Sequence, residues 1–263
     1  MNLIRRVYDK VLDVLEPADE PTILPSGSIR KIPTELLSRI CSAKLAEQCR
    51  LLDIPFLEVT LDRLSYAQPS LNGKVSAELA AFTYFQAQGY QGSYREGHAI
   101  LNLMRCACLD FLRQRTPFGD PVDASRHYFE AQCTSLQMHS EKIVHEIASA
   151  THRSVSSNLR SFLRHNVEES LYPTMDHAAM VALWDALGAQ KVAEIASIFV
   201  QDPYGFRAGW PDLTITRDGK VLFIEIITTD KLHKSQVRTI YELIKPADLD
   251  IRVLRVKYAK ASC

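Results

Sequence analysis

The sequence predicts an α/β protein with a mixed β-sheet core, flanking helices and a helical N-terminal region. The chain before Gly209 carries apolar residues mostly at helical spacing, as in residues 4–16 and 74–90. From Gly209 onward the pattern changes to strand, two-residue turn and strand, followed by an amphipathic helix and a closing strand. With 263 residues, of which 46% are apolar, the chain can fill one large domain or two small ones.

The N-terminal elements follow from local patterns. Residues 4–16 form an apolar stripe of helical period. Thr34 is placed to cap a second helix that extends to about Cys49. The segment 55–73 contains two prolines and little periodicity, so we expect a linker there. The first domain is therefore expected to be a helical region over residues 1–70.

The second predicted domain covers residues 71–263. Its first helix, over residues 74–90, has Gly89 where a helix commonly ends. Further helical segments follow through residues 127–200 without internal repeats, which predicts a helical insertion at about residues 110–190.

Two strands of the C-terminal part are predicted to form a hairpin that carries the most informative residues. The pair Asp218-Gly219 is typical of a two-residue hairpin turn, and this turn would bring Asp212 next to Glu225. Glu225 stands alone among apolar residues, where an ionised carboxylate is costly without a compensating cation. Two adjacent carboxylates suit a hard divalent cation. The alternative is that Glu225 pairs with a Lys or Arg of the following helix.

This region contains three sequence blocks in order: GWPDL at 209–213, FIEI at 223–226 and TDKLHKSQ at 229–236. At this spacing the blocks resemble the VRR-NUC family of the PD-(D/E)XK nuclease superfamily, which includes the Fanconi-associated nuclease. The close resemblance covers about residues 192–258. It implies a restriction-endonuclease-like fold and hydrolysis of DNA phosphodiester bonds.

A weaker resemblance extends upstream, to VSAE at 75–78 and REG at 95–97. In the Fanconi-associated enzymes such an element supplies a further active-site acid, which would be Glu96 here. The alternative is that Glu96 is an ordinary solvated acid near the start of a helix.

The resemblance implies a role for each of five residues. The acidic metal ligands would be Glu96, Asp212 and Glu225, and the backbone carbonyl of Ile226 would be a fourth ligand. Gln236 would belong to the same catalytic site. The expected cofactor is Mg²⁺ or Mn²⁺.

The sequence departs from the family at one catalytic position. The family has a lysine two residues after the strand glutamate, and this chain has Ile227 there. An isoleucine can neither orient water nor offset charge on the phosphate, and loss of one such group typically slows a reaction about a hundredfold to a thousandfold. Three explanations stay open: an inactivated variant of an active enzyme, a natural pseudonuclease, or substitution by Lys231, Lys234 or Arg207.

Charge indicates where DNA would bind. The chain has 31 basic and 31 acidic residues, so it is no globally basic nucleic-acid binder, but from Asp230 onward eight basic residues face four acidic ones. Phosphate contacts are therefore expected from Arg207, Lys231, Lys234 and Arg238. The resemblance implies branched or flapped DNA as substrate.

The sequence thus predicts a metal-dependent DNA nuclease that is inactive or weakened by Ile227. Two alternatives remain: a non-catalytic DNA-binding scaffold, and a stand-alone DNase toxin partnered by an immunity protein. Nucleotide-binding motifs such as GxxxxGK[ST] and GxGxxG are absent from the sequence. No signal peptide or membrane-spanning run is recognised, so a cytoplasmic, nuclear or nucleoid location is expected.

Overall fold

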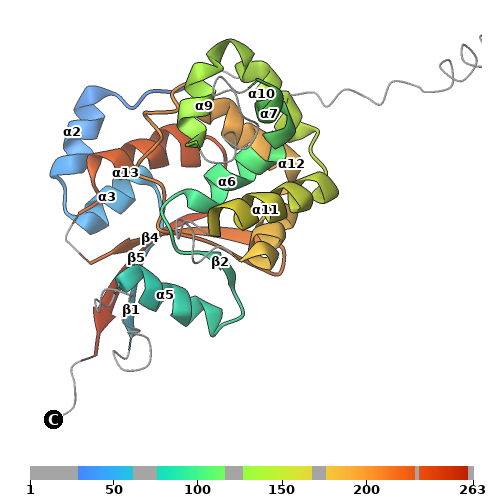
Figure 1. Ribbon diagram of the computed structural model, residues 1–263. Coiled ribbons are helices and arrows are strands. Elements are labelled where there is room, and N and C mark those ends of the chain that lie inside the picture. Colours follow the sequence, from blue (N-terminus) through green and yellow to red (C-terminus); the bar gives the residue numbers. More distant parts are fainter. Residues whose placement is uncertain (1–28, 62–75, 116–126, 168–175, 229–230, 260–263) are drawn as a thin grey trace, which may run out of the picture.

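The computed structural model describes residues 29–61, 76–115, 127–167, 176–228 and 231–259. The helix predicted over residues 4–16 and the domain boundary predicted near residue 70 both lie outside these ranges. Within them, a mixed five-stranded sheet has helices on both faces (Figure 1). The predicted α/β class with a mixed sheet is confirmed.

The sheet has the strand order β1-β5-β4-β3-β2. Strands β1, β5 and β4 run parallel to one another, whereas β3 is antiparallel to both β4 and β2. The parallel pair β4 and β5 is joined by a helical crossover, as parallel neighbours require. The strands are β1 Phe56–Leu61, β2 Gln91–Ser93, β3 Leu213–Arg217, β4 Lys220–Ile227 and β5 Ile251–Tyr258.

Among the described residues, one face of the sheet is covered by a single helix and the other by several. Helix α5, Ala77–Gln86, packs on the face formed by alternate residues such as Leu213, Ile224 and Ile226. The larger core lies on the opposite face, where Phe223, Ile227 and Val253 point into the main helical layer. Because side chains alternate along a strand, Glu225 shares this second face.

The main helical layer is built from segments that are distant in the sequence (Figure 1). Its long member α12 contacts both the sheet and several other helices. Described helices of this layer are α2 Thr34–Ser42, α3 Leu45–Leu52, α6 His98–Ala107, α7 Leu109–Arg115, α9 Phe129–Ser135, α10 Ser140–Ala148, α11 His152–Val167, α12 His177–Phe199 and α13 Lys234–Thr239, with a 3-10 turn η1 at Gln137–His139 and a π-helical turn η2 at Ile240–Ile244.

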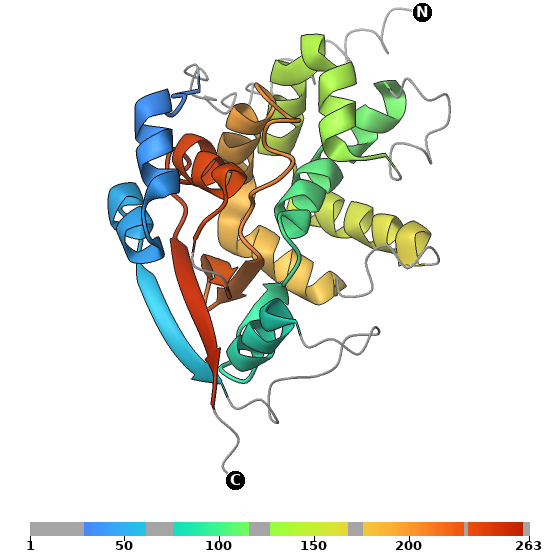
Figure 2. The ribbon, with the colours of Figure 1, turned by 90° about the vertical axis from the view of Figure 1, so that its left-hand side faces the viewer.

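The predicted linker at 55–73 is wrong in its first part. Residues 56–61 form β1, which lies along β5 at the sheet edge (Figure 2). Helices α2 and α3, just before it, contribute Ile40 and Leu52 to the same core as the C-terminal elements. The N-terminal region is therefore not purely helical, because its strand completes the sheet.

The C-terminal elements agree with the sequence prediction. Asp218 and Gly219 both have positive φ, 52° and 72°, as the two-residue turn between β3 and β4 requires. The helix and closing strand that follow are α13 and β5. Across the described ranges, every helix is too short or too polar to cross a bilayer.

Candidate active site

The hairpin of β3 and β4 brings Asp212 and Glu225 together. Leu213 pairs with Ile224, so extending this register by one residue places Asp212 opposite Glu225 on the same face of the sheet. Glu225 is only 2% exposed, whereas Asp212 is partly buried. The juxtaposition predicted from the turn is therefore present.

Hydrogen bonds fix both carboxylates. Asp212 Oδ2 accepts from the backbone N–H of Ile226 at 2.8 Å. Glu225 Oε1 accepts from the side-chain amide of Gln236 on α13, and Gln236 Oε1 in turn accepts from the backbone N–H of His233 at 2.6 Å. Gln236 thus links the start of α13 to β4 and orients the Glu225 carboxylate. Gln236 therefore lies beside the carboxylate pair, and its part in catalysis stays a prediction.

Both carboxyl groups are held toward their neutral form. Burial raises the pKa of Asp212 to about 6, and the carboxylates of Glu78, Glu96 and Glu225 lie close enough to affect it. Burial, followed by repulsion from Asp212, raises the pKa of Glu225 well above its usual range. No described Lys or Arg forms an ion pair with either residue, so within these ranges Glu225 does not have the cationic helix partner considered above. A cluster of carboxylates without a compensating charge is a place where a cation is favoured.

Whether a divalent cation fits can be judged from the donors present. Asp212 and Glu225 offer two adjacent carboxylates, and Mg²⁺ is commonly held by one or two carboxylates together with substrate phosphates. Among the described residues, however, no three His, Cys, Asp or Glu side chains are arranged to hold a metal ion by themselves. The site therefore fits a cation that completes its coordination with water and phosphate oxygens.

Glu96 lies at the edge of this cluster rather than inside it. Its side chain is exposed, and its Oε1 accepts a hydrogen bond from the backbone N–H of Gly209 at 2.5 Å. Gly209 has φ +86°, and a Cβ on it would lie 2.4 Å from the backbone of Ser235. The close approach at this glycine brings the loop ahead of Asp212 against the start of α13, which carries Gln236.

Glu78 is a fourth acid of the cluster that the sequence did not assign to the site. It lies in the first turn of α5, which packs on the opposite face of the sheet, and its charge contributes to the raised pKa of both Asp212 and Glu225. Its side chain also bonds to Ser76, the N-cap residue of α5. The weaker family resemblance at residues 75–78 was the one sequence signal that could have placed Glu78 near the site.

Ile227 is buried at 3% exposure in the large apolar core, together with Leu232 and Val237. It therefore packs toward α13 and presents no donor to the carboxylates. Lys231 and Lys234 are exposed, and in the described part of the chain neither bonds to Asp212 or Glu225. Lys231 Nζ instead lies 3.3 Å from the backbone carbonyl oxygen of Ser42.

The loop that leads into α13 is braced by the N-terminal helices. Gln48 of α3 is fully buried, and its Oε1 accepts from the backbone N–H of Leu232 at 2.7 Å. The Gln48 amide donates to the carbonyls of Leu232 and Ile40. Helices α2 and α3 therefore help to position the segment that contains Lys231 and Lys234.

The two predicted DNA-binding arginines are both engaged within the protein. Arg238 pairs with Asp202 at 2.6 Å and with Glu242 at 3.0 Å, and Glu242 also accepts from the backbone N–H of Ile32 at 2.9 Å. Arg207 is exposed and pairs with Glu130 at 3.3 Å. Glu242 thus links the N-terminal segment to Arg238 of α13, and Arg207 remains accessible from solvent.

Comparisons with known proteins show a fold likeness. No family model matches the chain, and no curated protein sequence does. The chain is similar to two crystal structures of paFAN1, bound to DNA with a gap and a 5′ flap of two nucleotides or of one. In both, the TM-score is 0.55 at 18% identity, over 80% and 79% of this chain but only 38% of paFAN1. The chain thus spans less than half of paFAN1, and its fold is restriction-endonuclease-like.

Proposed function

We propose that this protein is a metal-dependent nuclease that hydrolyses phosphodiester bonds of DNA, with Mg²⁺ or Mn²⁺ as cofactor. The observation that carries the proposal is the buried Asp212 and Glu225 pair, held side by side without a cationic partner in the described ranges. The fold likeness to paFAN1 supports the same reading.

Each residue of the cluster would have a distinct task. Asp212 and Glu225 would hold the cation, which when bound supplies an activated water and stabilises charge on the scissile phosphate. The Ile226 N–H fixes Asp212, and Gln236 orients Glu225. Glu96 would join through its Oε2 or through water, and the Ile226 carbonyl would be the further ligand.

DNA as the partner is supported by the two paFAN1 structures, which contain flap DNA. The exposed Lys231 and Lys234, in the loop and first turn of α13, are placed for phosphate contacts that do not depend on sequence. Branched or flapped DNA is the substrate we propose.

The burial of Ile227 favours a second candidate, a DNA-binding protein that does not cut. An apolar side chain at this position gives no electrostatic help to the phosphate, and we expect a rate lower by about a hundredfold or more than with lysine. A lysine there would share the sheet face of Glu225 and Asp212, because residues two apart on a strand point the same way.

Plasmid cleavage with Mn²⁺ tests these readings. The chain as it stands is compared with Ile227→Lys, with Ile227→Met as a control of similar size, and with Ile227→Lys combined with Asp212→Asn. Cleavage restored by lysine alone, and lost with Asp212→Asn, supports a weakened enzyme. DNA binding without cleavage in any variant supports the non-cutting alternative. Robust cleavage that ignores residue 227 but disappears in Lys234→Ala would show that another lysine has taken over.

A further inference from the structure

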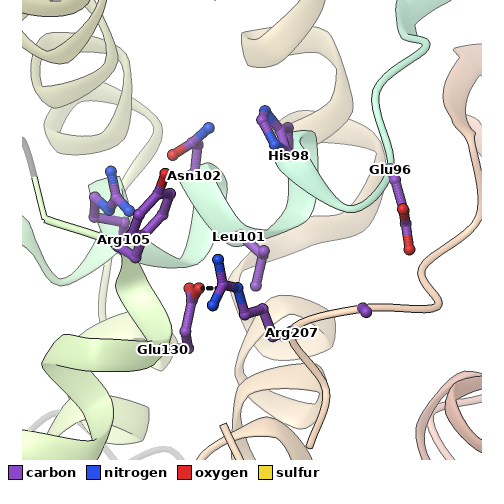
Figure 3. Close-up of a pocket in the computed structure, with 9 residues that line it drawn as sticks. Glu96, His98, Leu101, Asn102, Arg105, Glu130 and Arg207 are labelled. Carbon is purple, nitrogen blue, oxygen red and sulfur yellow. Dashed lines mark ion pairs between the residues drawn. The ribbon is translucent and has the colours of Figure 1, made fainter. Parts of the chain in front are cut away.

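A pocket of about 320 Å³ lies beside the carboxylate cluster, between α6, α9 and the loop before Gly209 (Figure 3). This volume is in the range of small-molecule sites. Glu96 belongs to both places: it lines the pocket, and its charge acts on Asp212 and Glu225. A ligand in the pocket would therefore lie next to a DNA strand bound across the candidate active site.

The inner wall of the pocket is polar although it is deeply buried. Asn102 and Arg105 of α6 are 2% and 3% exposed, and Glu130 of α9 is 4% exposed, yet all three line the pocket. Figure 3 shows Asn102 and Arg105 on one helix and Glu130 facing Arg207 across the opening. Buried polar groups of this kind give a pocket its specificity.

The rim carries an exposed aromatic ring. Tyr128, directly before α9, is 60% exposed, and the guanidinium of Arg207 lies 5.5 Å from its ring centroid. A tyrosine and an arginine arranged in this way form a stacking platform, on which proteins place unpaired bases. Burying the ring against a ligand would also remove apolar surface from water.

The charges of the pocket give a phosphate no net attraction. The two carboxylates of the wall, Glu96 and Glu130, are matched by the two guanidinium groups of Arg105 and Arg207, and Arg207 is already paired with Glu130. A nucleobase carries no charge and offers donors and acceptors along its edge. Carboxylates accept hydrogen bonds from the exocyclic amino group of a base such as cytosine, and thymine lacks that group.

We propose that this pocket takes one unpaired nucleobase of the bound DNA strand, stacked on Tyr128 and bonded through its amino group to Glu130. The proposal rests on the proposed function, because it names the part of a DNA substrate that this side of the site would bind. It implies that amino-bearing bases bind better than thymine.

Binding can be measured by fluorescence anisotropy in EDTA, so that cleavage plays no part. The probes are single-stranded oligonucleotides of equal length built from cytosine, from thymine, or from abasic residues, which keep every phosphate. We expect cytosine to bind about fivefold more tightly than thymine, and the abasic strand to bind most weakly. Tyr128→Ala should weaken cytosine binding about tenfold and leave the abasic strand unchanged.

Tyr204→Ala is the matched control, because Tyr204 is 54% exposed and lies outside the pocket lining. It should change none of the affinities, whereas Glu130→Gln should reduce the preference for cytosine over thymine. Equal binding of abasic and cytosine strands, or equal effects of the two tyrosine variants, would overturn the pocket assignment while DNA binding itself stands. Absence of binding to every strand would overturn both the assignment and the DNA-binding function.

Discussion

The raised pKa of Asp212 makes the stability of the metal-free protein depend on pH in an unusual direction. In the folded protein this pKa is about 6, above the ordinary value of 3.8, because the group is buried beside other carboxylates. Its contribution to the free energy of unfolding is therefore fully present below pH 3.8 and is lost as the pH rises through 6. Acidification from neutral pH should stabilise the protein through this group.

The magnitude follows from the two pKa values. Their difference corresponds to about 3 kcal/mol in all, at about 1.4 kcal/mol for each pKa unit. Between pH 7.5 and pH 5 about half of this, roughly 1.4 kcal/mol, should be gained, because the folded carboxyl is then mostly protonated and the unfolded one mostly ionised. The pKa of Glu225 is raised too, so it acts in the same direction.

Urea unfolding in EDTA at several pH values measures this effect, with Asp212→Asn as the matched control. Asparagine keeps an oxygen that can accept the Ile226 N–H but cannot titrate. Comparison with this control also removes the contributions of groups that change stability with pH in the opposite direction. One such group is Asp202, whose pKa is lowered because hydrogen bonds from Arg238 and Lys31 outweigh burial. Parallel pH profiles for the wild type and Asp212→Asn would refute the reasoning, since they would show that Asp212 titrates normally.

Four further predictions concern metal binding, DNA binding, an ion pair and the backbone. Mn²⁺ should raise the melting temperature more at pH 7.5 than at pH 5, and calorimetry should detect no such stabilisation in Asp212→Ala combined with Glu225→Ala. Lys231→Ala with Lys234→Ala should weaken DNA binding and flatten its salt dependence by about two phosphate contacts. Arg238→Ala should instead lower the free energy of unfolding by about 2 to 3 kcal/mol, because it leaves the buried Glu242 without its closest cation. An unchanged melting temperature of Arg238→Ala would contradict this. Gly209→Ala should destabilise the fold by about 2 kcal/mol or more in urea unfolding, because its Cβ would meet the Ser235 backbone. Gly219→Ala, which has open space around its Cβ, should cost only about 1 kcal/mol. Equal costs of the two variants would argue against the close approach at Gly209.

Local chemistry was sufficient to predict the centre of the fold. The Asp218-Gly219 turn fixes the register of β3 and β4, and this register alone places Asp212 opposite Glu225. Gln236 could be assigned only through the family resemblance, because its contact with Glu225 depends on how α13 packs against the sheet. The burial of Ile227 agrees with its apolar side chain.

Other features depend on contacts between distant segments and could not be derived from spacing. β1 is a short edge strand beside Pro55 with several exposed residues, and its partner β5 lies almost two hundred positions later. Glu78 reaches the cluster because α5 covers the opposite face of the sheet. Arg238 was read as a free cation, although Asp202 and Glu242 approach it from other parts of the chain.

The position of β1 determines where the chain can be shortened. A fragment that began after residue 61 would leave β5 as the sheet edge, with its row of backbone N–H and C=O groups open along the whole strand from Ile251 to Tyr258. Such a bare edge invites pairing with the same edge of another molecule. The fragment would also lack Gln48, which holds the backbone of Leu232. The smallest unit that keeps both the sheet and the start of α13 intact therefore has to include α2 and α3.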